Sequence, residues 1–305
     1  MGIYSSIYKA VGNTPLIYIP HLDIPIYAKL EYCNPGGSIK DRTALYMIEK
    51  AECSGLLKPG GIIIEASSGN QGASAAMIGN CKGYKTIVTM SEKVSSEKQA
   101  IFKAYNAEII LCKPSSNFTD KNHYYQVAKN IAQDNKNSYF LNQYFNSENS
   151  DAHFYGIAPE INKEVGDTVT YIFVAMGSGG TANGIARYMK VHNQKVKVIG
   201  VDSENSFIAT SGHPQPYYLD GMGVDYLTPF YDRDLFFDVV NISDKEAHEA
   251  LRMLVQKYGI LAGPASGGAM AAILKYKDNF NIADQVVTIF TDSGRSYLSK
   301  NYYQE

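Results

Sequence analysis

"GGIIIEASSGNQGASAAMIGNC", residues 60–81, indicates the fold more clearly than any other stretch of the chain. Its apolar run at 60–66 predicts a buried strand, its Ser-Ser-Gly-Asn segment predicts a tight turn, and the small residues that follow predict a helix. A strand that passes through a short turn into a helix is the repeating unit of a parallel sheet. The stretch therefore predicts at least one such unit.

Further strands and helices alternate on both sides of this stretch. Strands are predicted at 85–90, 107–112, 170–176, 195–202 and 285–294, and helices at 95–106, 182–192 and 243–259. Such alternation predicts an α/β protein with parallel sheets that helices cover on both faces. Glycine-rich turns at the carboxyl ends of the strands are where folds of this kind bind ligands.

The bulk composition excludes several classes of protein. The 305 residues are 45% hydrophobic and 19% charged, as in ordinary globular proteins, and a net charge of -2 gives no basic surface for nucleic acid. No apolar run reaches the roughly 18 residues of a membrane span, so we expect no membrane partner. The four cysteines form no Cys-x-x-Cys pair and the six histidines form no zinc motif. We therefore expect a cytoplasmic protein without a metal site.

One lysine occupies an unusual place in "CNPGGSIKDRTALYMIEKA", residues 33–51. Lys40 lies where a helix is predicted to begin, although the helix dipole disfavours a cation there. The dipole and partial burial both lower the pKa of a lysine, and a lysine with a lowered pKa is a nucleophile toward carbonyl groups. The alternative is a solvent-exposed lysine paired with Asp41 or Glu31.

The glycine-rich turn "MGSGGTANG", residues 176–184, lies between a predicted strand and a predicted helix. Consecutive backbone amides at a helix N-terminus form a cradle for phosphate. Gly177, Gly179 and Ala182 also satisfy the dinucleotide pattern G-x-G-x-x-A, with Asp202 as an acidic residue 20 positions further on. A turn that serves only packing is the third interpretation.

The turn "ASSGNQGAS", residues 66–74, has the same context. Ser67, Ser68, Gln71 and the amides of a helix start suit a carboxylate. Asn70 offers both a donor and an acceptor to a ring substituent. The alternative is a well-capped turn between a strand and a helix, without a ligand.

Four motifs in this order resemble the cysteine synthase / cystathionine β-synthase family. They are "VGNTPL" (11–16), "NPGGSIKDR" (34–42), "SSGNQG" (67–72) and "GSGGT" (177–181), and the resemblance extends from about residue 8 to 300. It implies a pyridoxal-phosphate enzyme of fold type II, similar to the tryptophan synthase β subunit. It also implies a homodimer, a smaller mobile domain at 35–146, and a larger cofactor-binding domain made of 1–34 and 147–305.

The resemblance implies a role for each matching residue. Lys40 matches the family's Schiff-base lysine, and Asn70 matches the asparagine that bonds the ring oxygen of the cofactor. Gly177, Ser178, Gly179, Gly180 and Thr181 match the phosphate-binding loop. The loop that closes on the substrate carboxylate corresponds to Ser67, Ser68, Gly69 and Gln71, aided by Gln143. Ser67 and Gln71 each replace the more common threonine.

Two positions depart from the pattern of cysteine synthases. Ala265 stands where these enzymes usually present a serine to the pyridine nitrogen, so that Ser266 or Ser293 is the candidate substitute. Asp225 stands where cystathionine β-synthases often have aspartate, and it is a candidate catalytic residue that positions homocysteine or activates a small nucleophile. Its alternative is a loop carboxylate paired with a surface cation.

The implied function is replacement of the β-substituent of a serine-type amino acid by a sulfur nucleophile. The products are cysteine from O-acetylserine and sulfide, or cystathionine from serine and homocysteine, so that the partners are a small amino acid and a thiol or sulfide. A serine/threonine dehydratase or a cysteine lyase is the alternative on the same fold. A more remote alternative is an NAD-dependent oxidoreductase in which Asp202 binds a ribose.

Overall fold

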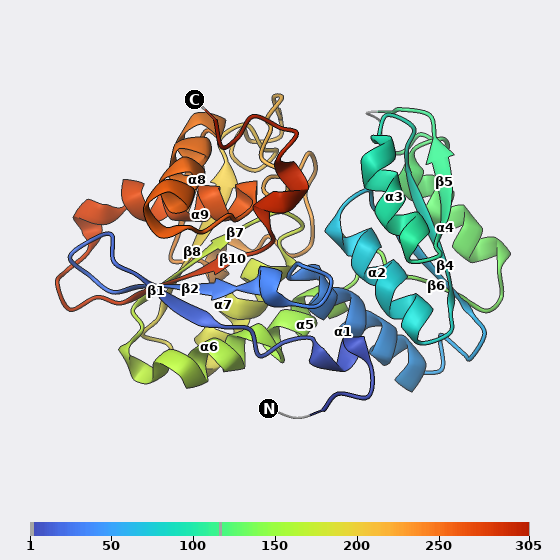
Figure 1. Cartoon of the computed structure of the whole chain (residues 1–305), viewed down its shortest axis with the longest axis horizontal. Coiled ribbons are helices and arrows are strands. Elements are labelled where there is room, and N and C mark those ends of the chain that lie inside the picture. The colour runs from blue at the N-terminus through green and yellow to red at the C-terminus, as the bar shows by residue number, and fades with distance from the viewer. Residues whose placement is uncertain (1–2, 116–117, 305) are drawn as a thin grey trace. The chain divides into compact units, whose positions relative to one another are not determined.

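A computed structural model describes residues 3–115 and 118–304 of the chain (Figure 1). The chain divides into two compact units. Unit 1 consists of Met1–Val11 and Lys40–Asn149, and unit 2 consists of Gly12–Ile39 and Ser150–Glu305. Each unit contains one sheet and its own covering helices, so each is described by itself.

The sheet of unit 1 is parallel throughout, and its strand order is β5-β4-β3-β6. The chain runs outward from β3 through β4 to β5, then crosses to the other side of β3 and forms β6. The order of the strands therefore reverses between β3 and β6. The strands are β3 (Ile62–Ala66), β4 (Lys85–Ser91), β5 (Glu108–Cys112) and β6 (Ser138–Phe140).

Helices cover both faces of this sheet because successive side chains of β3 point to opposite sides. Ile63 packs in a cluster with residues of two helices, α1 (Lys40–Cys53) and α2 (Asn70–Cys81). Its neighbour Ile64 packs instead with residues of α4 (Tyr124–Asp134). Next to α2, the helix α3 (Ser96–Ala104) buries Phe102 against Val88 of β4. The apolar run of β3 is therefore continuous because both faces are buried.

The N-terminal segment belongs to unit 1, whereas the sequence analysis assigned residues 1–34 to the larger domain. The short helix η1 (Ile7–Ala10) contains Tyr8, whose ring packs against the cluster of α1 and α2. The ammonium group of Lys82 lies 4.9 Å from the centre of the same ring. These contacts explain why the first eleven residues group with unit 1.

The sheet of unit 2 has the strand order β1-β2-β10-β7-β8-β9. All pairs are parallel except the edge pair β1–β2, which is antiparallel. The chain runs from β7 through β8 to β9, and β10 later returns to the other side of β7, so the order reverses between β7 and β10. The strands are β1 (Leu16–Ile19), β2 (Ile26–Leu30), β7 (Tyr171–Ala175), β8 (Lys197–Ser203), β9 (Asp238–Ile242) and β10 (Val286–Phe290).

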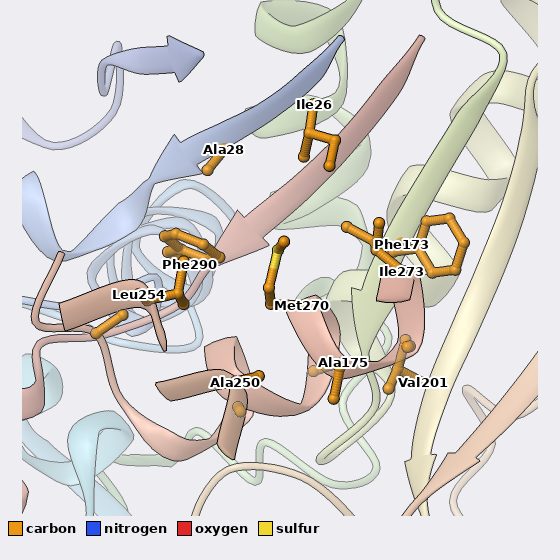
Figure 2. Packing of buried hydrophobic residues seen from close by; sticks show 14 of the residues in the cluster. Ile26, Ala28, Phe173, Ala175, Val201, Ala250, Leu254, Met270, Ile273 and Phe290 are labelled. Atoms are coloured by element: carbon orange, nitrogen blue, oxygen red, sulfur yellow. The ribbon is translucent and has the colours of Figure 1, made fainter. Parts of the chain in front are cut away.

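Two layers of helices enclose this sheet. Phe173 of β7 and Phe290 of β10 face the layer of α8 (Asp244–Tyr258) and α9 (Pro264–Lys275), as Figure 2 shows. Ile172, the neighbour of Phe173, faces the opposite layer. That layer contains α6 (Ile157–Val165) and α7 (Gly180–His192), and the chain enters unit 2 along α5 (Glu148–Phe154). Both units thus confirm the predicted α/β class with helix-covered parallel sheets.

Helix α8 shows how local sequence sets the ends of an element. Ser243 is the N-cap, and its hydroxyl oxygen accepts the backbone N–H of Glu246, while the Glu246 side chain accepts the N–H of Ser243. Gly259 ends the helix with a φ of 66°, in the left-handed region that glycine adopts without strain. The sequence predicted a helix at 243–259, and the capping box and the glycine fix its limits.

No helix in residues 3–115 and 118–304 is long and apolar enough to cross a membrane.

The central position of Phe290 leads to a stability prediction. Phe290 is 0% exposed, and its truncation leaves a cavity that the packed layers do not fill. We expect Phe290→Ala to lower the free energy of unfolding of the cofactor-free chain by about 3–5 kcal/mol in urea titrations. Phe237→Ala, at a side chain that is 55% exposed, is the matched control and is expected to change it by less than about 1 kcal/mol. Equal losses in the two variants would contradict the described core.

Candidate active site

The turn between β7 and α7 packs its backbone closely against Phe230 and leaves the first amides of α7 without a capping side chain from the N-cap. Gly179 is the N-cap of α7 and has a φ of 90°, and a Cβ at this position would lie 3.1 Å from the Cβ of Phe230. No side chain of the N-cap accepts the amides of the first turn of α7. These amides and the positive end of the helix dipole provide a site for an anion such as phosphate.

Neighbouring side chains hold this turn and add hydroxyl groups to it. The side chains of Ser178 and Thr181 are buried, with exposed fractions of 7% and 9%. Thr228 donates a hydrogen bond of 2.9 Å to the backbone oxygen of Ser178. The hydroxyl oxygen of Thr181 lies 3.1 Å from Nε2 of His153 on α5. His153 was not predicted from the sequence, because nothing in its local pattern links it to a turn 28 residues away.

Asp202, the acidic residue of the dinucleotide hypothesis, does not face a ligand. Its side chain is 0% exposed, and it accepts hydrogen bonds from the Ser206 hydroxyl at 2.5 Å and the Ser203 N–H at 2.9 Å. Burial is the largest cause that raises the pKa of Asp202 to about 6. The carboxylate thus holds the loop after β8 together and is not accessible to a ribose.

The turn after β3 in unit 1 has a similar construction. Gly69 is the N-cap of α2 and supplies no capping side chain, and its own N–H donates to the Ser67 hydroxyl at 3.2 Å. Ser67 is buried, whereas Ser68 and Asn70 are partly exposed. The amides at the start of α2 have no capping side chain from the N-cap, so they are available to an anionic group, and binding of a carboxylate there stays a prediction.

Two glutamines lie at the carboxyl edge of the unit 1 sheet where the strand order reverses. Gln71, in the first turn of α2, is 2% exposed, and neither polar atom of its side chain has a hydrogen-bond partner. Gln143 follows β6 and is 6% exposed. Buried polar groups without partners cost about 1–3 kcal/mol each, so native proteins contain few of them. The Gln71 amide is therefore a candidate to bond a ligand.

Lys40 is the first residue of α1, as the sequence predicted, and its side chain is half-buried. The next residue, Asp41, is 0% exposed and accepts a hydrogen bond of 2.5 Å from the Ser74 hydroxyl of α2. This bond ties the start of α1 to the first turns of α2. Glu31, the other expected partner of Lys40, is buried in unit 2, where it accepts the Thr14 hydroxyl at 2.6 Å.

Glu65, near the end of β3, is the second residue that the sequence analysis did not single out. It is 1% exposed, and neither carboxylate oxygen has a hydrogen-bond partner. Burial raises the pKa of Glu65 to about 8, although the Lys40 charge and the backbone amides of Ala66 and Asn142 oppose this rise. These amides lie near the carboxylate without forming a hydrogen bond of good geometry. A single charged residue inside the apolar run of β3 was the available signal.

The three remaining candidates each make a structural hydrogen bond in unit 2. Ser266 on α9 is 0% exposed, and its hydroxyl oxygen accepts the Thr291 N–H at 3.1 Å, just beyond β10. Ser293 accepts the N–H of Arg295 at 3.3 Å as the N-cap of a short helix. Asp225 is exposed and accepts a hydrogen bond of 3.2 Å from the Tyr217 hydroxyl.

Residues 7–292 match the family of pyridoxal-phosphate-dependent enzymes. The chain belongs to this family. It is a pyridoxal-phosphate-dependent enzyme, and the resemblance seen in its four motifs is thereby confirmed.

Its relatives carry two related names. It is 37% identical to the cystathionine beta-synthase of Saccharomyces cerevisiae over 97% of this chain, which is 62% of the yeast protein's length. It is 36% identical to the cysteine synthase of Helicobacter pylori over 99% of this chain and 100% of the relative. The solved structure of an O-acetylserine-dependent cystathionine beta-synthase from Helicobacter pylori superposes with a TM-score of 0.91 at 36% identity, covering 99% of this chain and 100% of that chain.

The turn before α7 and the start of α1 each have features that fit the chemistry of this cofactor. Gly179 leaves the amides of α7 accessible where a Cβ would approach Phe230, which suits the phosphate of the cofactor. The half-buried Lys40 at a helix start suits a covalent attachment through its amine. Among the described residues, no group of three or more His, Cys, Asp or Glu side chains is placed to hold a metal ion.

The conformation of Gly179 predicts weaker cofactor binding after substitution. An added Cβ strains the left-handed backbone and meets Phe230, so the amides of α7 shift away from the phosphate. We expect Gly179→Ala to raise the Kd of pyridoxal phosphate about tenfold or more, which corresponds to about 1.4 kcal/mol, in a fluorescence titration of the cofactor-free chain. Gly55→Ala is the matched control, because Gly55 has a φ of 72° and open space around it. An unchanged Kd for Gly179→Ala would contradict the assignment of this turn.

Proposed function

We propose that this enzyme replaces the β-substituent of a serine-type amino acid by a sulfur nucleophile. The observation that carries the proposal is the turn after β3, where the start of α2 has no capping side chain and the buried Gln71 amide has no partner. Such a site suits the carboxylate that every amino-acid substrate carries. The names of the relatives, cysteine synthase and cystathionine beta-synthase, support the same substrate class.

Each candidate residue has a definite task in this proposal. When bound, pyridoxal phosphate supplies the electron sink for negative charge at the substrate α-carbon. The Lys40 amine holds the cofactor and accepts the α-proton of the substrate. Asn70 bonds the ring oxygen of the cofactor, and the amides and hydroxyls of residues 177–181 bind its phosphate.

The substrate carboxylate is bound by the turn after β3. Ser67, Ser68 and the amide of Gly69 donate to it together with Gln71, and Gln143 contributes from the neighbouring end of β6. All of these residues belong to unit 1. We infer that unit 1 corresponds to the smaller, mobile domain expected at residues 35–146, because a domain that closes over the substrate would carry this whole set of donors.

Ser266 is the better candidate for a hydroxyl group at the pyridine nitrogen. It is fully buried, and its hydroxyl oxygen accepts one hydrogen bond while its hydrogen can still be donated. Ser293 uses its oxygen to cap a short helix, which supports a structural role. The exposed Asp225, bonded by Tyr217, is a candidate for contact with the incoming nucleophile and not for a buried catalytic task.

The assembly of the enzyme is inferred from its family, and its location is inferred from its cysteines. We infer a homodimer from the family resemblance. Cys33, Cys53 and Cys81 are exposed free thiols, and Cys112 is a buried one. Free exposed thiols are typical of the reducing cytoplasm, where we propose that the enzyme works.

An assay of defined products tests the reaction class. The purified chain with pyridoxal phosphate is incubated with O-acetylserine and sulfide, with serine and homocysteine, or with serine alone, and the products are identified by mass spectrometry. The proposal predicts cysteine in the first mixture, cystathionine in the second, or both. Pyruvate from serine alone, without either sulfur product, would favour the dehydratase and contradict β-replacement.

The same assay tests the role assigned to Lys40. Without the amine that accepts the α-proton, we expect Lys40→Ala to lower kcat by about 10²–10⁴-fold or more. Lys58→Ala, at an exposed lysine next to β3, is the matched control and is expected to retain full activity. A Lys40→Ala variant with near-normal turnover would overturn this assignment.

A further inference from the structure

The loop of residues 218–224 in unit 2 lies directly against the turn that we propose for the cofactor phosphate. The N–H of Gly223 donates a hydrogen bond of 2.8 Å to the backbone oxygen of Met176, at the start of the turn. A Cβ added to Gly177 would lie only 2.6 Å from the backbone oxygen of Gly221. The two backbones are therefore in contact without a side chain between them, so that the position of the turn depends on that of the loop.

The same loop is anchored in the helix layer of α8 and α9. Leu219 and Met222 are 2% and 1% exposed, and both belong to the core cluster that contains residues of these helices. Gly268 of α9 makes room for Met222, because a Cβ there would lie 2.8 Å from the Met222 sulfur. The loop thus contacts both α9 and the turn, and one charged residue, Asp220, lies between its two buried anchors.

Asp220 is bound by two side chains of the segment 297–303. The Lys300 ammonium group forms an ion pair with the Asp220 carboxylate, and both side chains are partly exposed. The Tyr302 hydroxyl lies 3.1 Å from the same carboxylate and 2.9 Å from the backbone oxygen of Tyr218. The Lys300 ammonium also lies 5.5 Å from the centre of the Tyr302 ring. The two side chains therefore hold the loop together, directly before the residue that contacts the turn.

Packing against α8 fixes the place of Tyr302. Its side chain is 7% exposed, and its ring stacks on that of His248 with ring centres 4.4 Å apart and an angle of 22° between the planes. Leu251 of the same helix belongs to the same cluster. The next residue, Tyr303, donates a hydrogen bond of 2.7 Å to the backbone oxygen of Ala262, just before α9. These contacts give the segment a defined position from which it holds the loop.

We propose that Lys300 and Tyr302 are positioning residues for the phosphate-binding turn. They bind Asp220 and the backbone of Tyr218, the loop that contains these two residues contacts residues 176–177, and the turn presents the first amides of α7. The inference rests on the proposed function of residues 177–181 as the phosphate site. A binding site needs its donors within about 0.5 Å of the productive geometry. A loosened loop should therefore weaken binding of the phosphate group and leave the other contacts of the cofactor unchanged.

Two ligands test the inference, because pyridoxal is pyridoxal phosphate without its phosphate group. Binding of each to the full chain without cofactor is followed by a fluorescence titration. We expect Lys300→Ala and Tyr302→Phe each to raise the Kd of pyridoxal phosphate about three- to tenfold and to leave the Kd of pyridoxal unchanged. A general loss of structure would raise both values. An equal rise for both ligands, or no rise for either, would overturn the proposal.

Matched variants control for the loss of a cation and of a hydroxyl group. Lys245→Ala, at a side chain that is 84% exposed, and Tyr18→Phe, at a residue that is 55% exposed, should leave both Kd values unchanged. Lys300→Arg keeps the positive charge beside Asp220 and should retain the preference of the wild type for pyridoxal phosphate. A loss in Lys300→Arg as large as that in Lys300→Ala would contradict a role of the ion pair.

A double-mutant cycle tests whether Lys300 acts through Asp220. We expect Asp220→Ala alone to raise the Kd of pyridoxal phosphate about as much as Lys300→Ala does. If the two side chains act as one unit, the double variant should bind little worse than either single variant, because the second substitution removes a contact that is already lost. Effects of the two substitutions that multiply fully in the double variant would refute the path through Asp220.

The variant Gly179→Ala separates this inference from the proposed function. Gly179 lies in the turn itself, so its substitution should also raise the Kd of pyridoxal phosphate and not that of pyridoxal. If Gly179→Ala changes the preference between the two ligands whereas Lys300→Ala and Tyr302→Phe do not, only the positioning role is refuted. If none of the three variants changes it, the assignment of the turn is refuted, and the inference with it.

Discussion

Both candidate turns of this enzyme depend on the point at which the strand order of a parallel sheet reverses. At that point the connections from two adjacent strands lead away in opposite directions, so that the carboxyl ends of these strands stay open to a ligand. In unit 1 the reversal lies between β3 and β6, and in unit 2 it lies between β7 and β10. The turn after β3 carries residues 67–70, and the turn after β7 carries residues 176–179. Each turn leads directly into a helix whose N-cap is a glycine. The same topology thus produces an anion site in each unit.

Burial of polar groups gives the unit 1 site its chemical character. Glu65 and Gln71 are almost fully buried with side-chain atoms that lack partners, and they flank the turn that we propose for the substrate carboxylate. Such atoms lower the stability of the free protein, and they are candidates for bonding a ligand where they flank an uncapped helix start.

The sequence predicted the interior of the fold better than its edges. The strands within 60–66 and 170–176 are buried on both faces, so nearly all of their residues are apolar. Such a continuous apolar run is easily recognised in a sequence. The antiparallel edge pair β1–β2 and the short strand β6 were not predicted. β6 has only three residues, and all of them are half-buried. β1 has four residues and contains the exposed Tyr18, so neither strand is a long run of buried apolar residues.

The candidate site was predicted as far as its residues lie in compact motifs. Lys40 and the two glycine-rich turns each combine a strand or helix boundary with unusual residues, and the structure places all of them at helix starts. The single charged residue in the apolar run of β3 was a local signal for Glu65, whereas His153 contacts Thr181, 28 residues away on another helix, and no local pattern reveals such a contact. The choice between Ser266 and Ser293 depended on burial and hydrogen bonding for the same reason.

The attachment site of the cofactor is the most direct test of this account. The purified chain saturated with pyridoxal phosphate is reduced with borohydride, which makes the bond between lysine and cofactor permanent, and the digested protein is mapped by mass spectrometry. The account predicts that the added mass lies on the peptide that contains Lys40, at the start of α1. Attachment to another residue, such as the buried Lys29 of β2, or no attachment to any lysine, would contradict it.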